Sequence, residues 1–395
     1  MHRRSSAPLY RLSLASFAAA AILFANSDLS AASAIVPTIP SEEDAPIGLL
    51  VDLSTGQTLF AREAERRFAP ASITKVMSAY TAFQLLSKDR LDLSQVMTVR
   101  PETFDKWSRV GSTMFLPRDA QVTVGQLLMG VTAVSANDGA AVLAEGAAGS
   151  VDNWVALMNA NARRLGMRDS HFATPNGWPD GGATYTSARD LVKLASATIS
   201  EHPNLYTAFF GKPGFSYGGI TQRNHDPISG VVQGADGLKT GYTDQAGYTF
   251  LGSAERDGRR LVMVVAASDT ARARDRASRS LMEWGFAAFD HHKLLPVDHA
   301  VAMAQVQNGS KTEVALVADG PLSVTVPRGT RPAVAMSVHY DGPIRAPVEA
   351  GETLGRLHVA IEGMPSYSIP LKAGERVEKA GPLLRVRNGI LGWFS

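Results

Sequence analysis

Three short motifs constrain the fold most strongly, because their side chains have to meet although they stand far apart in the sequence. They are Ser72-Ile-Thr-Lys75, Ser135-Ala-Asn137 and Lys239-Thr-Gly241, and each occurs once. In the first, a helix places a hydroxyl and an amine on one face. The second adds a hydroxyl and an amide. The third adds a cation and a hydroxyl beside a residue without a side chain, which allows close approach to the backbone. This combination is what acyl transfer with a serine nucleophile requires.

The residues that follow Ser72 predict a helix from Val76 to Leu86, so Ser72 is expected at a helix N-terminus. Free backbone N–H groups and the helix dipole favour developing negative charge there. Lys75 lies one turn further on and is expected partly inside the protein. Desolvation or a neighbouring cation would lower its pKa and allow it to act as a base. The structural alternative is an N-capping Ser72 and a solvated Lys75.

The surroundings of the other two motifs predict where they lie. Residues 122–131 form an apolar helical run ending near Gly130, and residues 138–145 resume a helix, so the second motif is expected in a tight turn facing a cleft. The third motif is expected on a strand. At a sheet edge, such a strand can pair with an extended peptide. Lys239 and Thr240 would then hold a terminal carboxylate through charge-assisted hydrogen bonds.

A family resemblance rests on six segments. They are Ser72-Ile-Thr-Lys-Val-Met, Gly111-Ser-Thr-Met-Phe-Leu, Ser135-Ala-Asn-Asp-Gly-Ala-Ala-Val-Leu-Ala-Glu, Thr174-Pro-Asn-Gly, Ser187-Ala-Arg-Asp-Leu and Asp236-Gly-Leu-Lys-Thr-Gly. The set closely resembles the low-molecular-mass penicillin-binding proteins that are serine-type D-alanyl-D-alanine carboxypeptidases. It runs from about residue 47 to residue 286 and continues more loosely through residues 346–355. The resemblance implies an α/β, β-lactamase-like transpeptidase domain, with helices flanking an antiparallel sheet, followed by a small all-β sandwich.

The resemblance also implies roles for the catalytic residues. Ser72 attacks the carbonyl between two D-alanines, with Lys75 as its base, and water later resolves the acyl-enzyme. Ser135 and Asn137 relay the proton to the leaving amine and position the peptide amide. The backbone N–H groups of Ser72 and Tyr242 form the oxyanion hole. Which group deprotonates the serine is left open, as in related enzymes.

Substrate binding is assigned to the third motif and its neighbour, namely Lys239, Thr240, Gly241 and Tyr242. This part departs from the family pattern twice. Several relatives have His in place of Tyr242, and relatives often have Asn-Arg-Asn where this chain has Asn224-His225-Asp226. If that arginine helps to bind the carboxylate, Arg223 or Arg274 is the candidate to replace it.

The N-terminus predicts export. Arg3, Arg4 and Arg11 precede an apolar run from Leu12 to Phe24, and a small-residue cleavage site follows, which is typical of a signal peptide spanning residues 1–34. The run is too short to span a bilayer. Export favours a periplasmic location. The resemblance implies an enzyme that acts on peptidoglycan stem peptides ending in D-Ala-D-Ala and is acylated by β-lactam antibiotics.

Composition excludes several classes of function. The predicted signal peptide carries three Arg and one Asp, so its removal takes the formal charge from +2 to zero, which gives no reason to expect nucleic-acid binding. The chain has no Cys, which excludes disulfides, thiol catalysis and thiolate metal sites. The adjacent His291 and His292 are interpreted as a boundary feature, and no metal and no cofactor are expected.

The pattern changes near residue 288. We predict a catalytic domain over residues 35–288 and a β-sandwich stalk over residues 295–380, because short alternating strands at 322–326, 334–340 and 357–361 are separated by Gly and Pro. Residues 381–395 are basic and aromatic and end in Trp393-Phe394. Family members often carry a C-terminal amphipathic anchor, so we expect this segment to bind the outer face of the cytoplasmic membrane. A final strand or docked tail is the alternative.

Four other functions are compatible with parts of the sequence. A class A β-lactamase needs a carboxylate to activate water, yet no Glu occurs between Glu145 and Glu201. An α/β-hydrolase is suggested by Gly214-Phe-Ser-Tyr-Gly218, but the flanking residues indicate a turn. A non-catalytic cell-wall-binding protein would tolerate loss of Ser72 or Lys75, and both are present. A DD-endopeptidase of the same fold stays open, as do the physiological peptide and the oligomeric state.

Overall fold

The computed structural model describes residues 37–297 and 299–381. These form two compact units. The first contains residues 37–292 together with 323–329, and the second contains residues 293–322 and 330–381, apart from residue 298. The predicted signal peptide and residues 382–395 of the predicted anchor lie outside the described residues. Within the described ranges, no helix combines the length and the apolar character needed to cross a membrane.

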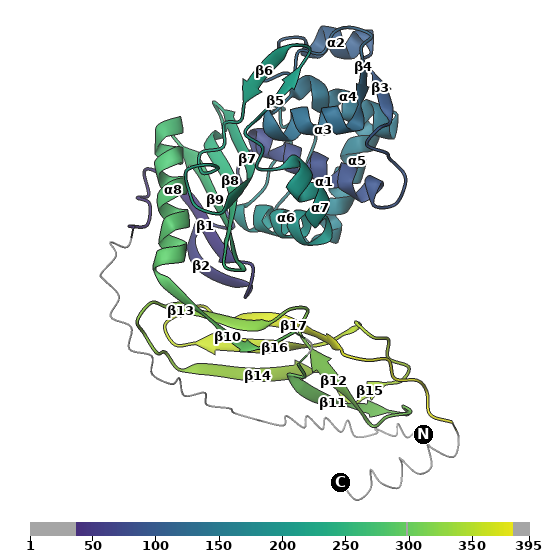
Figure 1. Cartoon of the computed structure of the whole chain (residues 1–395), viewed down its shortest axis with the longest axis vertical. Coiled ribbons are helices and arrows are strands. Elements are labelled where there is room, and N and C mark those ends of the chain that lie inside the picture. Colours follow the sequence, from purple (N-terminus) through teal and green to yellow (C-terminus); the bar gives the residue numbers. More distant parts are fainter. Residues whose placement is uncertain (1–36, 298, 382–395) are drawn as a thin grey trace, which may run out of the picture. The chain divides into compact units, whose positions relative to one another are not determined.

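Five antiparallel strands form the central sheet of the first unit (Figure 1). They are β1 (Ile47–Asp52), β2 (Gln57–Arg62), β7 (Ala235–Thr243), β8 (Gly247–Arg256) and β9 (Arg259–Ser268). Their order is β2-β1-β9-β8-β7. The predicted strand around Lys239 is thus confirmed as β7, and it lies at the sheet edge that a peptide could extend.

Both faces of this sheet are covered, which explains why its inner strands β1 and β9 are largely apolar. Val262 and Val264 pack into the core shared with the helices α1 to α6, whereas Met263 and Val265 pack into a second core under α8 (Ala271–Ala287). Figure 1 shows α8 along one face and the larger helical cluster on the other. The alternation follows from the period of two in a strand. It confirms the predicted antiparallel sheet flanked by helices.

The helical cluster surrounds α1, in which nearly every residue is buried. The cluster consists of a short 3₁₀ turn η1 (Ala71–Ile73) and the helices α1 (Thr74–Leu86), α2 (Pro101–Trp107), α3 (Val124–Ala133), α4 (Asn137–Ala148), α5 (Val151–Arg164), α6 (Ala188–Glu201) and α7 (Pro203–Phe209). Two small hairpins complete the unit, β3 (Val96–Thr98) with β4 (Gln121–Thr123) and β5 (Gly214–Tyr217) with β6 (Ile220–Arg223). A central helix needs an apolar surface all round.

The predicted end of the helix near Gly130 is wrong, because α3 continues to Ala133. Gly130 stays inside the helix since the sulfur of Met114 packs against it, where a Cβ atom would lie only 2.5 Å from that sulfur. Glycine is present there for close packing and not as a helix stop. The helix begins instead with a capping box, in which the Thr123 side chain accepts from Gln126 N–H and the Gln126 side chain accepts from Thr123 N–H.

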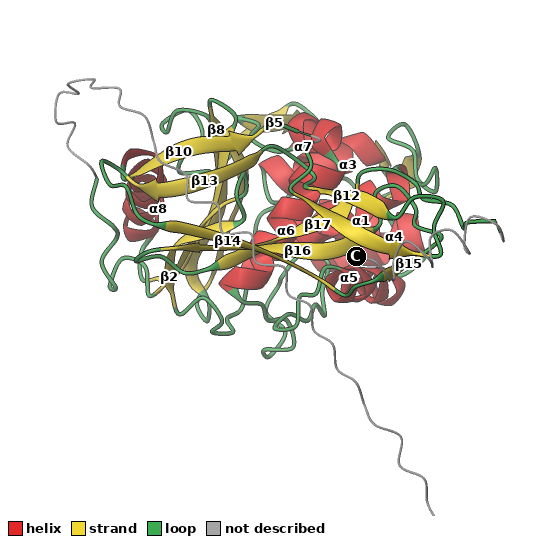
Figure 2. Ribbon diagram, turned by 90° about the horizontal axis from the view of Figure 1, so that it is seen from below, coloured by secondary structure: helices red, strands yellow, loops and turns green. Residues whose placement is uncertain are grey.

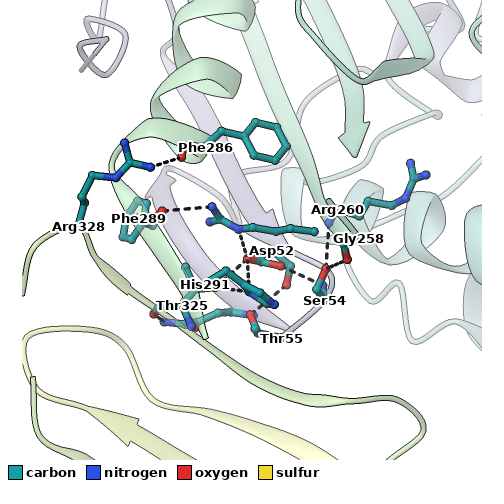
Figure 3. A network of polar contacts seen from close by, with 12 residues as sticks. Asp52, Ser54, Thr55, Gly258, Arg260, Phe286, Phe289, His291, Thr325 and Arg328 are labelled. Atoms are coloured by element: carbon teal, nitrogen blue, oxygen red, sulfur yellow. Dashed lines mark hydrogen bonds and ion pairs between the residues drawn. The ribbon is translucent and has the colours of Figure 1, made fainter. Parts of the chain in front are cut away.

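A buried polar network fixes residues 323–329 to the first unit (Figure 3). Asp52, at the end of β1, accepts hydrogen bonds from Arg259 Nε at 2.7 Å and from Thr325 Oγ1 at 2.8 Å. The Gln57 side chain bonds both backbone groups of Thr325, with distances of 2.8 and 3.2 Å. Thr325 belongs to β13 (Leu322–Pro327), which pairs with β10 (Phe289–Leu295).

The second unit is built from strands, as Figure 2 shows, which confirms the predicted all-β C-terminal part. Its six-stranded sheet has the order β14-β16-β17-β12-β11-β15. The strands are β11 (Ala302–Gln307), β12 (Glu313–Val317), β14 (Val334–Tyr340), β15 (Ile344–Arg345), β16 (Thr353–Ile361) and β17 (Tyr367–Ala373). Alternating residues such as Leu357 and Val359 are buried, which accounts for the period of two in the sequence.

Candidate active site

Lys75 is the centre of the candidate site. It lies in the first turn of α1 and is completely buried, deeper than the sequence predicted. Its ammonium group donates three hydrogen bonds, to Ser72 Oγ at 2.9 Å, to Asn137 Oδ1 at 2.8 Å and to the backbone oxygen of Asn176 at 2.8 Å. Ser72 lies in η1 just before α1, so the predicted helix start is confirmed. The first two motifs are therefore in direct contact.

Burial lowers the pKa of Lys75 well below its usual value, and the positive charge of Lys239 lowers it further, while the Asp138 carboxylate opposes the shift. A neutral amine carries a lone pair that can accept the hydroxyl hydrogen of Ser72. The same contact at 2.9 Å thus serves either protonation state. Geometry and electrostatics together make Lys75 suitable as a general base.

Ser135 lies in the predicted tight turn between α3 and α4. Its φ of 63° is in the left-handed region, which few residues other than glycine adopt. Its hydroxyl is buried and has no hydrogen-bond partner among the described residues. A strained backbone that holds an unpartnered hydroxyl in a site is typical of a group that meets a substrate.

Asn137 and Asp138 start α4 and fix the segment 110–116 beside it. Asn137 Nδ2 donates to Val110 O at 3.0 Å, so the amide is held at both ends. Asp138 accepts from the backbone N–H groups of Met114 and Leu116 at 3.0 and 3.1 Å. Burial raises the pKa of Asp138, and these N–H groups oppose the rise. Sequence reasoning missed this role, although a lone carboxylate inside an apolar run is a usable signal.

Asn176 is a second residue that the sequence did not reveal as part of the site. Its carbonyl accepts from Lys75, and its side-chain oxygen accepts from Trp178 N–H at 3.1 Å. The next residue, Gly177, has a φ of 73°, and a Cβ atom there would lie 1.8 Å from Ala71 O. The loop therefore packs directly on the turn that carries Ser72. The Thr174-Pro-Asn-Gly segment, quoted above for its resemblance, was the available signal.

The third motif adds a second buried amine. Lys239 is buried on β7, where desolvation and the positive charge of Arg274 lower its pKa to about 7, against the opposing effect of Asp226. Its Nζ donates to Thr240 O at 3.0 Å. A cation held in this environment gains from an anionic partner such as a carboxylate.

Arg274 and His225 accompany Lys239. Arg274 is buried on α8 and donates to Thr249 O at 3.3 Å, and Thr249 is the register partner of Gly241. Burial lowers the pKa of His225, and the charges of Lys239 and Arg274 lower it further. Of the two arginines suggested by the sequence, Arg274 is thus the one that lies near Lys239, whereas Arg223 is exposed on β6.

Gly241 lacks a side chain at a point where β7 packs closely on neighbouring residues. A Cβ atom there would lie 2.7 Å from Pro70 O and 2.5 Å from Thr249 Oγ1. The glycine faces the turn preceding Ser72, so its role is to let β7 approach that turn. Because of this approach, the nucleophile lies beside the edge strand.

The ring of Tyr242 lies at the protein surface, outside this buried cluster. The ring is half exposed and stacks on Tyr248, with 4.2 Å between centroids and 27° between planes. Its hydroxyl donates to Asp244 Oδ1 at 2.7 Å, and this bond raises the pKa of Tyr242 to about 12. The ring is thus held at the surface next to the third motif.

Two other features lie apart from the catalytic cluster. The Gly214–Gly218 match forms part of the hairpin β5–β6, and Ser216 Oγ shares a hydrogen bond of 2.8 Å with Thr221 Oγ1. A hairpin is not the strand-to-helix turn of a nucleophile elbow, so the predicted chance match is confirmed. In residues 37–297 and 299–381, no group of three His, Asp or Glu side chains is arranged to hold a metal ion.

Comparison with known proteins agrees with this geometry. A family model described as D-alanyl-D-alanine carboxypeptidase matches residues 33–270, and one for the C-terminal domain of penicillin-binding protein 5 matches residues 289–379. The D-alanyl-D-alanine carboxypeptidase DacA of Escherichia coli K12 is 32% identical over 342 residues, covering 85% of this chain and 84% of that protein.

Two solved structures are similar as well. Penicillin-binding protein 5 of Haemophilus influenzae is 30% identical with a TM-score of 0.74, covering 87% of this chain and all of the other. Penicillin-binding protein D2 of Listeria monocytogenes, solved in an ampicillin-bound form, is 29% identical with a TM-score of 0.55, covering 62% of this chain and 97% of the other. The chain therefore belongs to the D-alanyl-D-alanine carboxypeptidase family and is a serine-type carboxypeptidase of the penicillin-binding protein class.

Proposed function

We propose that the enzyme removes the terminal D-alanine from peptidoglycan stem pentapeptides through an acyl-enzyme on Ser72. The observation that carries this proposal is the contact of 2.9 Å between Ser72 Oγ and the buried, pKa-lowered amine of Lys75. Neutral Lys75 takes the hydroxyl proton as Oγ bonds to the carbonyl carbon between the two D-alanines. The backbone N–H groups of Ser72 and Tyr242 stabilise the resulting oxyanion.

Collapse of this intermediate breaks the C–N bond and releases D-alanine. The leaving nitrogen takes up a proton through Ser135, whose unpartnered hydroxyl supports this role. Asn137, held between Lys75 and Val110, positions the substrate amide. Water then attacks the ester, Ser72 recovers its proton, and the shortened peptide departs. A β-lactam follows the first step with its ring amide in place of the peptide bond.

Carboxylate recognition is assigned to Lys239 and Thr240, with Arg274 beside them. Burial and the nearby charge of Arg274 lower the pKa of Lys239, and a bound carboxylate would offset both effects by favouring the charged amine. Gly241 brings this strand against the nucleophile, and Tyr242 supplies the second oxyanion donor from its backbone. The substrate is then fixed at its terminal carboxylate and at its reacting carbonyl.

Labelling with a fluorescent penicillin tests the nucleophile. The wild type is expected to form a stable covalent adduct and Ser72→Ala none, while Ser87→Ala, at the exposed end of α1, serves as the matched control and labels normally. An adduct in Ser72→Ala would refute the assignment. D-alanine release from a pentapeptide, measured beside cleavage of a cross-linked peptide dimer, separates carboxypeptidase from endopeptidase activity. Absence of both activities would favour a non-catalytic binding protein.

We also propose that the enzyme works in the periplasm, exported by residues 1–34 and held on the outer face of the cytoplasmic membrane by residues 381–395. The support is the sequence: a charged then apolar N-terminal run, and a basic, aromatic C-terminal segment. Deletion of residues 390–395 is expected to move the enzyme from the membrane fraction to the soluble fraction. Unchanged membrane recovery would contradict the anchor.

A further inference from the structure

Trp178 is a large apolar side chain left 40% exposed beside the catalytic residues. Its position is fixed by short-range contacts to the site. Its backbone N–H donates to the Asn176 side chain, the carbonyl of that same Asn176 accepts from Lys75, and Gly177 between them packs on Ala71. The backbone that carries the ring is therefore tied to Lys75 and belongs to a preformed segment.

The indole ring lies next to the amide that positions the substrate. A Cβ atom on Gly111 would be 2.7 Å from Trp178 Cζ3 and 2.8 Å from Asn137 Nδ2, so the ring and the amide both lie against the same glycine. Behind the ring, Trp107 packs edge-on, with 5.7 Å between centroids and 84° between planes. Trp107 is buried at the end of α2 and backs the exposed ring.

A second exposed aromatic surface lies on the edge strand. Tyr242, stacked on Tyr248, is half exposed on β7 just after the third motif. The loop that bears Trp178 reaches the same end of β7, because a Cβ atom on Gly182 would lie 4.0 Å from Gln245 Nε2 in the β7–β8 turn. Exposed aromatic rings gathered at a site are typical of a binding surface.

The direction of the substrate follows from the proposed function, on which this inference rests. If Lys239 and Thr240 hold the terminal carboxylate and Tyr242 N–H faces the reacting carbonyl, the rest of the peptide continues along β7 toward Thr243. That is the end where the Trp178 loop lies. The residue that precedes the D-alanine pair therefore passes between Trp178 and the tyrosine pair.

We propose that Trp178, backed by Trp107, is a specificity-determining residue that binds a long aliphatic side chain on the peptide residue preceding D-Ala-D-Ala. An indole face removes methylene groups from water and places no hydrogen-bonding demand on them. A short side chain at that position would not span the distance to the ring. The site is thus expected to prefer peptides with an extended side chain at this position over peptides with a methyl group there.

The test compares two peptides that differ only at this residue, Nα,Nε-diacetyl-L-Lys-D-Ala-D-Ala and Nα-acetyl-L-Ala-D-Ala-D-Ala. Trp178→Ala is expected to lower kcat/KM for D-alanine release from the lysyl peptide by about tenfold and to change that of the alanyl peptide by less than about twofold. Trp178→Phe, which keeps an aromatic face, is expected to restore most of the preference. Equal losses on both peptides, or no loss on either, would overturn the proposal.

Acylation by 6-aminopenicillanic acid separates this proposal from a purely structural role and from the proposed function. This β-lactam lacks an acyl side chain, so its acylation rate is expected to be the same in wild type and Trp178→Ala. A parallel fall in this rate would show that the loop is only a support for Lys75 and would overturn the proposal. Failure of wild-type acylation or of D-alanine release from both peptides would instead refute the proposed function.

Discussion

Lys75 Nζ lies 2.8 Å from Asn137 Oδ1, a residue 62 positions further along the chain. This bond joins the first motif to the second, while repulsion between the two buried lysines joins the first to the third. Burial and the charge of Lys239 lower the pKa of Lys75, while burial and the charge of Arg274 lower the pKa of Lys239 to about 7. The proposed mechanism needs a neutral Lys75 and a charged Lys239 at the same pH.

A bell-shaped pH profile is the first expected consequence. kcat/KM for D-alanine release should rise as Lys75 becomes neutral and should fall as Lys239 loses its charge, around pH 7, since its pKa is about 7. In the profile of kcat, the falling limb should move to higher pH, because the bound carboxylate favours the charged form of Lys239. A falling limb that coincides in the two profiles would argue against carboxylate binding by Lys239.

Removal of the Lys239 charge should shift the rising limb. In Lys239→Gln, the pKa of Lys75 loses one of the two causes that depress it, so the midpoint of the rising limb should move to higher pH. This midpoint is measured from the pH dependence of the rate of acylation by a β-lactam. It does not depend on the weaker substrate binding that is expected of this variant. Lys88→Gln, beyond the end of α1, is the control and should leave the midpoint in place. A shift to lower pH would contradict the coupling.

The sequence predicts the features of this site that neighbouring residues determine, and it does not predict the contacts between residues far apart in the chain. The helix start at Ser72, the turn at Ser135 and the strand at Lys239 are set by local pattern, and all three are found as predicted. The roles of Asn176 and Asp138 depend on which loops meet them in three dimensions. Nothing in the local sequence records that the carbonyl of Asn176 meets Lys75, 101 positions away.

Glycines show the same limit. Gly130 stands where the sequence predicts the end of a helix, and Gly241 stands where it predicts close approach of a substrate. In the structure both glycines allow close packing, against Met114 and against Pro70. A glycine looks the same in the sequence whether it is needed for a backbone angle, for a ligand or for close packing of a neighbouring element. The neighbour that decides between these roles comes from a distant part of the chain.

Ser135→Ala should separate catalysis from stability. The buried hydroxyl has no partner among the described residues, so its removal breaks no hydrogen bond and should change the free energy of unfolding by less than about 0.5 kcal/mol. Penicillin acylation should fall by about 10²-fold or more, the usual size for loss of a proton-transfer group. Ser278→Ala on α8 removes another buried, unpartnered hydroxyl and is the matched control, with activity unchanged. Equal activities of the two variants would exclude a role for Ser135 in proton transfer.

Gly177→Ala should be far more damaging than Gly181→Ala, although both residues lie in one loop. The φ angles are nearly equal, 73° and 72°, so the backbone strain of an alanine is the same, about 1–2 kcal/mol. At Gly177 the new Cβ would also lie 1.8 Å from Ala71 O, whereas at Gly181 nothing lies within 4 Å. Only Gly177→Ala should lose penicillin labelling, because the collision displaces the turn carrying Ser72. Similar labelling and unfolding midpoints in both would show that the loop does not press on that turn.

The buried pair of Asp52 and Arg259 should be critical for stability although it lies outside the catalytic cluster. Asp52 is completely buried and Arg259 nearly so, at 2.7 Å, and Asp52 also accepts from Thr325 at 2.8 Å (Figure 3). Asp52→Ala leaves a guanidinium buried without its counter-charge, which costs about 3–5 kcal/mol. Thr325→Val keeps the shape and removes one bond to a charged group, a loss of about 1.5–3 kcal/mol.

Urea unfolding of the full chain tests this order when the readout is retention of penicillin binding, which reports the first unit alone. The midpoint should fall most for Asp52→Ala and less for Thr325→Val. Glu65→Gln breaks the exposed pair with Arg189, at 2.6 Å, and is the matched control with an expected change below about 1 kcal/mol. The two ion pairs differ little in length, so a large difference in their effects would come from burial. Equal, small shifts in all three variants would mean that residues 323–329 are held to the first unit by apolar contacts and not by this network.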